Sequence, residues 1–179
     1  MLSPLLQLID KWAWIGEVFV LFILLFFALR DKKPNSSLMA MTITVILGFI
    51  MRFYAPYLKA VTEPEYYAYV LLVYYVGFFI IDMFAIYLLY KLHVTFIIRY
   101  SFISKMIVAA FFIKGQLHFF RYSERLLMGF DSNYLKPLYQ AGIPAVNIGI
   151  VVSSLAFVLA MGVSRYRVAK GKGGLNWLL

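Results

Sequence analysis

The sequence of 179 residues contains no cysteine and few charged side chains, and each shortage excludes a class of protein. Without cysteine there is no disulfide framework, no thiol chemistry and no cysteine-based zinc or iron–sulfur site. Charged residues make up 14% of the chain and hydrophobic residues 64%, whereas a soluble domain carries about 25% charged and about 45–50% apolar residues. We therefore expect an all-α integral membrane protein without a soluble domain.

Motifs for catalysis are also missing. The two histidines have no carboxylates at metal-ligand spacing, and the sequence contains no His-Glu-x-x-His, Gly-x-Ser-x-Gly, Walker or dinucleotide-binding pattern. Ser104 precedes Lys105, but neighbouring residues point about 100° apart on a helix, which disfavours a serine–lysine dyad. We expect no enzyme activity, no bound metal and no cofactor.

The net charge of +9 is explained better by a membrane than by nucleic acid. Lys and Arg cluster in the flanks of apolar segments, where they set the orientation of the chain and attract anionic lipid headgroups. The sequence therefore predicts anionic lipid as a partner and no nucleic-acid binding.

Hydrophobic stretches of membrane length follow one another along the chain. About 20 apolar residues at about 1.5 Å per residue span a hydrocarbon core of about 30 Å. The last of these stretches has Pro144 near its start, which is expected to lie in the first helical turn. The predicted transmembrane helices are 12–29, 37–58, 66–90, 100–120 and 142–163, and a basic tail over 164–179 follows them.

The segment 100–120 allows two interpretations, because it is apolar overall but contains two lysines and a histidine. It either crosses the membrane or lies on its surface as an amphipathic helix. If it crosses, the basic flanks 30–33 and 165–172 lie on the same side, which the positive-inside rule places in the cytoplasm. We therefore expect five helices rather than four, a cytoplasmic C-terminus, and residence in a bacterial cytoplasmic (inner) membrane.

Five ionisable residues lie within the predicted helices, where an unpaired charge is costly and each is a candidate functional residue. Their depths along the helices sort them into two layers. The outer layer contains Glu17, Arg52, Lys114 and the amide Asn147, and the inner layer contains Asp82 and Lys105. Because buried charges are normally paired, the layers are either structural ion pairs or the lining of a water-filled path or anion site.

A basic stripe follows one face of the fourth predicted helix. Its members, spaced i, i+4, i+7 and i+11, are Lys114, His118, Arg121 and Arg125. The stripe is either an edge that faces water and headgroups, or a basic vestibule or docking edge. Lys105 points to the opposite side of the same helix, which favours a central position for that helix or a homo-oligomer.

The fifth predicted helix carries a small-residue stripe that favours close packing of helices and therefore assembly into a homo-oligomer. The stripe consists of Ala145, Gly149, Ser153, Ala156 and Ala160. The tail after this helix is expected either to bind anionic headgroups or to recruit a soluble cytoplasmic protein. Its basic residues are Arg165, Arg167, Lys170 and Lys172.

These features support two functions. The first is a homo-oligomeric channel or pore-like component in which the charged layers line the path. The second is a non-conducting membrane anchor or sensor subunit that recruits a soluble cytoplasmic effector, for example in bacterial phage defence or toxin–immunity. An architectural analogy of this kind does not choose between them.

Overall fold

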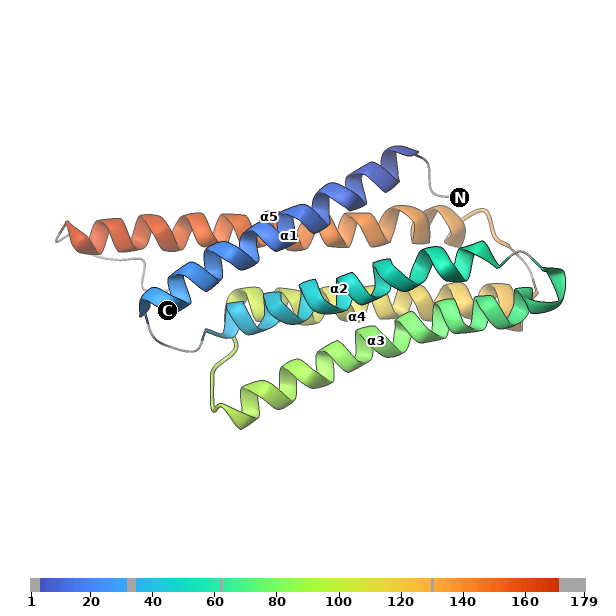
Figure 1. Ribbon diagram of the computed structural model, residues 1–179, viewed down its shortest axis with the longest axis horizontal. Coiled ribbons are helices and arrows are strands. Elements are labelled where there is room, and N and C mark those ends of the chain that lie inside the picture. The colour runs from blue at the N-terminus through green and yellow to red at the C-terminus, as the bar shows by residue number, and fades with distance from the viewer. Residues whose placement is uncertain (1–3, 32–34, 62, 130, 171–179) are drawn as a thin grey trace.

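Five long helices that run alternately in opposite directions form the molecule (Figure 1). The computed structural model describes residues 4–31, 35–61, 63–129 and 131–170, and these ranges contain no β-strand. Each long helix is long and apolar enough to cross a membrane, as expected of the five-helix interpretation. The helices are α1 (Pro4–Asp31), α2 (Ser36–Ala60), α3 (Tyr67–Thr95), α4 (Phe102–Tyr122) and α5 (Leu135–Ala169); a 3₁₀ turn η1 (Pro64–Tyr66) precedes α3, and a π-helical turn η2 (Ser123–Leu127) follows α4.

Helix α4 occupies the centre of the bundle and packs against α2, α3 and α5. Its membrane-length segment is 44% buried, compared with 17–28% in the other four helices. This is the central position that its two polar faces favoured. Helix α1 crosses the outside of α5 (Figure 1), and a Cβ added at Gly16 would lie only 2.7 Å from Cγ1 of Val151, so the two backbones approach closely there.

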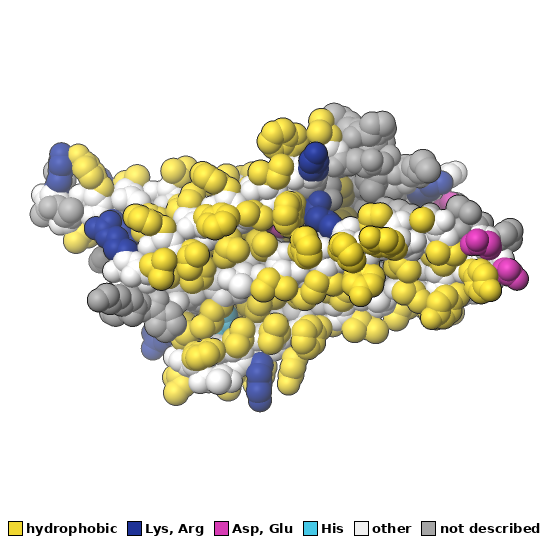
Figure 2. Space-filling view, in the orientation of Figure 1, with side chains coloured by type: hydrophobic (Ala, Val, Ile, Leu, Met, Phe, Trp, Pro, Cys, Tyr) yellow, Lys and Arg dark blue, Asp and Glu magenta, His cyan; other side chains and the backbone are white. Residues whose placement is uncertain are grey.

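The surface and the interior are reversed relative to a soluble bundle. Hydrophobic side chains dominate the visible face of the molecule (Figure 2), and large apolar residues such as Phe22, Tyr69 and Leu159 are more than half exposed. Ionisable side chains instead lie inside: the buried ones are Glu17, Asp82, His93, Lys114, His118, Arg121 and Glu124. A bundle of this kind suits an apolar environment, because its helices satisfy their own backbone hydrogen bonds and its exterior is apolar.

Three helices extend well beyond their predicted bounds, and the first of them, α1, begins at Pro4 and not at 12. Helix α3 continues to Thr95, five residues past the predicted end at 90. Helix α5 begins at Leu135, so Pro144 lies inside the helix and the prediction that it belongs to the first turn is wrong. Pro137 occupies the first turn instead, where a backbone N–H has no intrahelical partner and a proline is tolerated.

A cluster of hydrogen-bonded serines connects α2, α3 and α4 at one end of the bundle. The Ser36 Oγ lies 2.6 Å from His93 Nε2 and 2.7 Å from Ser104 Oγ, and it accepts a hydrogen bond from the Ser101 N–H at 3.0 Å. The His93 Nδ1 is 2.7 Å from the Leu89 carbonyl oxygen, so this nitrogen carries the proton and Nε2 accepts from Ser36. We call this the serine end; it lies where α1 joins α2 and α3 joins α4.

Short motifs at the starts of two helices position this cluster. Asn35 caps α2 by accepting from the Ser37 N–H at 2.9 Å, and Ser101 caps α4 by accepting from the Ser104 N–H at 3.2 Å. Ser36 is 5% exposed and its hydroxyl already has several partners. The cluster therefore serves as a tie between helices rather than as an accessible nucleophile.

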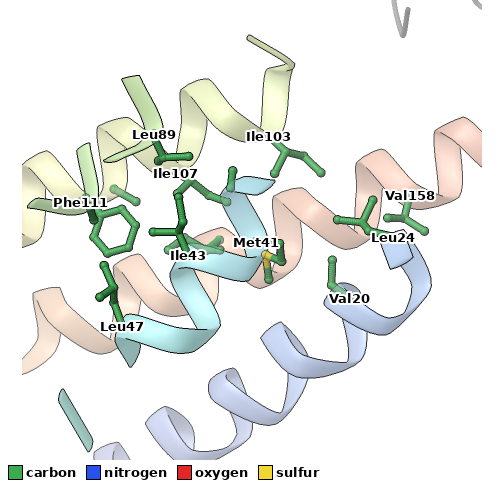
Figure 3. Close-up of a cluster of buried hydrophobic side chains, with 14 residues drawn as sticks. Val20, Leu24, Met41, Ile43, Leu47, Leu89, Ile103, Ile107, Phe111 and Val158 are labelled. Carbon is green, nitrogen blue, oxygen red and sulfur yellow. The ribbon is translucent and has the colours of Figure 1, made fainter. Parts of the chain in front are cut away.

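The apolar core fills the half of the bundle nearest the serine end. It includes Leu24 of α1, Met41 of α2, Leu89 of α3 and the α4 residues Ile107 and Phe111, all of which are at most 1% exposed (Figure 3). Because the core is confined to this half, the other half is left for the polar residues described next.

Candidate functional site

A central cavity of about 160 Å³ lies within the bundle and is lined by residues from all five helices. One buried water needs about 10–15 Å³ of such space, so the cavity has room for several. All four members of the predicted outer layer line it. The polar and aromatic lining consists of Glu17, Thr44, Arg52, Tyr74, Phe78, Lys114, His118, Tyr139, Gln140 and Asn147.

A second, larger cavity of about 340 Å³ lies towards the end of the bundle where α2 joins α3 and α4 joins α5. We call it the vestibule and this end the vestibule end. Its charged lining residues are Arg121, Arg125 and Lys136. The vestibule and the central cavity share Tyr74, Tyr139 and Gln140, so the two spaces adjoin at these three side chains, which we call the constriction.

The basic stripe of α4 faces the interior of the bundle. Lys114, His118 and Arg121 are 7%, 2% and 4% exposed, and Arg125 is half-buried and donates a hydrogen bond to the Tyr67 hydroxyl. The interpretation of the stripe as an edge that faces water and headgroups is therefore wrong. The stripe instead runs from the central cavity to the vestibule.

The carboxylate of Asp82 is the most deeply buried charge among the cavity residues and their neighbours. It is 0% exposed, with Lys114 Nζ 3.7 Å from its Oδ1 and His118 Nε2 3.7 Å from its Oδ2. Neither oxygen has a hydrogen-bond partner within the described residues. The His118 Nδ1 is 3.0 Å from the Tyr139 hydroxyl, so a chain of polar groups leads from the constriction to Asp82.

The expected pairing of Asp82 with Lys105 is wrong. Lys105 lies in the first turn of α4 near the serine end, and its side chain is exposed. Because α3 is longer than predicted, Asp82 lies opposite Gly115 rather than opposite Lys105. A Cβ added at Gly115 would lie 3.6 Å from the Asp82 Cβ and 2.5 Å from the Met83 Cε, so the two helices approach closely at this point.

An ion-pair network, buried at Arg121 and Glu124 and exposed at Asp131 and Lys136, closes the vestibule end of α4. Arg121 donates hydrogen bonds to both Glu124 and Asp131, and the 1% exposed Glu124 also accepts from the Ser132 N–H at 2.6 Å. Lys136 Nζ lies 3.3 Å from Asp131 Oδ2. The hydrogen bond from Arg121 lowers the pKa of the Asp131 carboxyl below its ordinary value. The network attaches the α4–α5 connection to the end of α4.

Sequence reasoning missed several of these residues. Glu124, Asp131 and Tyr139 were not selected because they lie outside the predicted helices. The available signal was the i, i+3 spacing of Arg121 and Glu124, which places opposite charges on one face of a helix.

The small-residue stripe of α5 faces away from the bundle. Ala145, Gly149 and Ala156 are exposed, Ser153 and Ala160 are half-buried, and a Cβ added at Gly149 would meet nothing within 4 Å. The stripe is therefore not used for close packing at Gly149 within the described subunit. Its role between subunits stays a prediction.

The basic residues of the predicted tail 164–179 are only partly described, and α5 continues into this tail as far as Ala169. Arg165 of α5 is paired with Asp31 of α1, with its Nη1 3.0 Å from Asp31 Oδ1, and its guanidinium carbon lies 4.7 Å from the centre of the Phe27 ring. Arg167 and Lys170 are exposed, and Lys172 lies outside the described residues. One of the four predicted contact residues is thus engaged in an ion pair between helices.

Neither a metal-binding geometry in the described residues nor a match to a known protein indicates a function for this site. The described part of the chain contains no group of three or more His, Asp or Glu residues placed to hold a metal ion. No protein-family model matches the chain, and no curated protein or solved structure is similar to it. The function must therefore be argued from the cavities and their side chains.

Proposed function

We propose that the chain is an integral membrane protein that conducts a small ion through the polar interior of its own helix bundle, as a channel or pore-like component. The single observation that carries this proposal is that the two cavities adjoin, since both are lined by Tyr74, Tyr139 and Gln140. Charged residues from α1, α2, α4 and α5 line the combined space. Ionisable groups in membrane helices mark ion pathways when they face a water-filled cavity.

Residence in a membrane is supported by the apolar exterior and by five helices of sufficient length. The positive-inside rule gives the orientation. The basic residues Lys91, Arg99 and Arg167 lie towards the serine end, so we place the serine end and the C-terminus in the cytoplasm of a bacterial inner membrane. The vestibule then opens on the outer side, where anionic headgroups can contact its basic residues.

A second candidate function is favoured by the position of the apolar core. Phe111, Ile107 and Met41 fill the bundle between the central cavity and the serine end. A path closed at one end suits a non-conducting sensor that binds a solute from outside and signals to a soluble cytoplasmic partner. The exposed Arg167 and Lys170 are the residues through which such a partner of acidic character would bind.

Ion flux into liposomes distinguishes the two functions. We expect purified protein to admit chloride into liposomes, and the Lys114→Gln variant to lower the rate at least about tenfold, equivalent to about 1.4 kcal/mol, because it removes a buried cation from the path. Lys105→Gln is the matched control, since this lysine lies exposed on the same helix and should leave the flux unchanged. Absence of chloride, potassium and nitrate flux in correctly inserted wild-type protein would favour the sensor.

Assembly into a homo-oligomer is the remaining part of the proposal, and the outward-facing small-residue stripe supports it. Gly149→Leu should shift the protein to a smaller assembly, because a large side chain prevents close approach of a second α5. Light scattering coupled to size exclusion in detergent measures the mass. Ile80→Leu, on the exposed surface of α3, is the control. A single monomeric mass for the wild type would exclude this mode of assembly.

A further inference from the structure

The ammonium group of Lys114 lies between an accessible cavity and a buried carboxylate. Lys114 lines the central cavity, whereas Asp82 lies behind it, with its Oδ1 3.7 Å from the Lys114 Nζ. That separation is longer than a hydrogen bond. Asp82 therefore attracts the lysine without forming a hydrogen bond to it. A second anion in the cavity can compete with Asp82 for the ammonium group.

The groups around Asp82 can be assigned to their helices. From α4, Lys114 and His118 face it, and from α5, Tyr139 approaches it through His118. On α3 itself, the buried Tyr75 lies two turns earlier on the same face. The other ionisable residues of the central cavity are Glu17 of α1 and Arg52 of α2. Asp82 thus has two basic groups at 3.7 Å, Lys114 and His118. Its carboxylate has no hydrogen bond within the described residues that would favour one protonation state over the other.

A route for protons reaches this carboxylate from the constriction. The Tyr139 hydroxyl lies 3.0 Å from His118 Nδ1, and His118 Nε2 lies 3.7 Å from Asp82 Oδ2. An imidazole can take up a proton on one nitrogen and release it from the other. Tyr139 lines both the vestibule and the central cavity, so the outer end of this route is in contact with both spaces.

We propose that the central cavity binds a small anion together with a proton, with the anion held by Lys114 and the proton carried by Asp82. When Asp82 is ionised, it neutralises Lys114, and the formal charges of Glu17 and Arg52 also balance, so an entering anion meets no net positive charge. When Asp82 is protonated, the charge of Lys114 is no longer balanced by its neighbour, and an anion in the cavity compensates it. Binding of the two species is therefore mutually favourable, as linkage requires.

The size and lining of the cavity indicate the class of anion. A space for several waters accommodates a halide, nitrate or a short carboxylate such as formate. Asn147, Gln140 and Arg52 also line this space, and each of them already has a partner within the protein. This inference deepens the proposed function and rests on it for access to the cavity from water, but binding and conduction can be measured separately.

Trp14 provides a local signal for binding. Its indole Nε1 lies 4.0 Å from the Cβ position of Gly48, which lines the central cavity, and the Arg52 guanidinium carbon lies 5.9 Å from the centre of its ring. The sequence has three tryptophans, so a Trp12→Phe, Trp177→Phe double variant leaves Trp14 as the only one. Its fluorescence during titration with sodium nitrate reports the apparent dissociation constant.

The decisive experiment titrates this protein with nitrate at several pH values and records proton uptake with an indicator dye in weak buffer. We expect uptake of about one proton per nitrate, and a dissociation constant that rises up to about tenfold per pH unit on the alkaline side. Asp82→Asn should bind nitrate without proton uptake and without the pH dependence. Lys114→Gln should lose binding, and Lys105→Gln should behave as wild type.

Several outcomes overturn the inference. Nitrate binding without proton uptake in the wild type excludes it, whether or not Asp82→Asn folds. Proton-linked binding that persists in a folded Asp82→Asn variant assigns the proton to another group, and failure of nitrate, chloride and formate to bind removes the anion site. Flux without proton linkage contradicts only this inference, whereas proton-linked binding without flux contradicts only the proposed channel.

Discussion

Replacement of Asp82 by alanine is expected to lower the free energy of unfolding by about 3–5 kcal/mol, because it leaves a buried ammonium group without its counterion. Lys114 is 7% exposed, and its Nζ lies 3.7 Å from the Asp82 carboxylate. Its other near neighbour is the face of the Phe111 ring, 4.3 Å from the Nζ, which compensates only a small part of the loss. Unfolding in mild detergent, followed by circular dichroism, measures the change.

A double variant tests the cause of this loss. Asp82→Ala combined with Lys114→Met should recover most of the stability, because no unpaired charge then remains and methionine fills a similar volume. Asp31→Ala is the matched control: it disrupts a more exposed pair with Arg165, whose side chains are 38% and 34% exposed, and should cost about 0–1 kcal/mol. A double variant no more stable than Asp82→Ala would show that the charge pair is not the cause.

The second large effect is expected for Arg121→Ala, again about 3–5 kcal/mol. Arg121 is the donor shared by Glu124 and Asp131, and Glu124 is only 1% exposed. Without the guanidinium group, Glu124 retains the Ser132 N–H but has lost its cation. We expect the α4–α5 connection to detach from the end of α4, with faster hydrogen exchange over residues 128–134 in addition to the lower stability.

The controls for Arg121 use the geometry of its side chain. Arg121→Lys should rescue the stability only in part, because one ammonium group cannot reproduce the fork that reaches two carboxylates. Arg125→Ala, which removes a hydrogen bond to the exposed Tyr67, should cost less than about 1 kcal/mol. Equal losses for Arg121→Ala and Arg125→Ala would contradict the assigned role of the network.

Acid weakens the same network. Because the pKa of Asp131 is lower in the folded protein, its contribution to stability is present above the unfolded pKa of about 3.9 and is lost as the pH falls through the folded value. The acid-induced loss of stability should therefore be shallower in Arg121→Ala than in the wild type. Unfolding curves of both proteins recorded at several pH values measure this difference in acid-induced loss of stability.

The number and order of the helices follow from the sequence because hydrophobic length is a local property. The same depth argument placed Glu17, Arg52, Lys114 and Asn147 in one layer, and these residues do line one cavity. For Asn147, for example, α5 (Leu135–Ala169) extends past the predicted span 142–163 at both ends, so the middle of the helix hardly moves. The composition of the cavity lining was therefore largely predictable.

The partner of Asp82 was not predictable in the same way. The sequence gives no clear stop for α3 at 90, and the helix runs on to Thr95, which changes the register between α3 and α4. Pairing across helices depends on that register, so Gly115 and Lys114 replace Lys105 opposite Asp82. The hydrogen bond between Ser36 and His93 is also hidden, because it joins residues 57 positions apart that have no shared pattern.

The packing of the first helix against the last has a consequence for how the protein is made. Chains are synthesised from the N-terminus, so in the proposed membrane protein α1 enters the membrane first and waits for α5, which is translated last. Until Val151 arrives, the groove at Gly16 is unfilled, and Glu17 lacks the wall of its cavity that Asn147 supplies. The packing around the first helix is therefore completed only by the last part of the chain to be made.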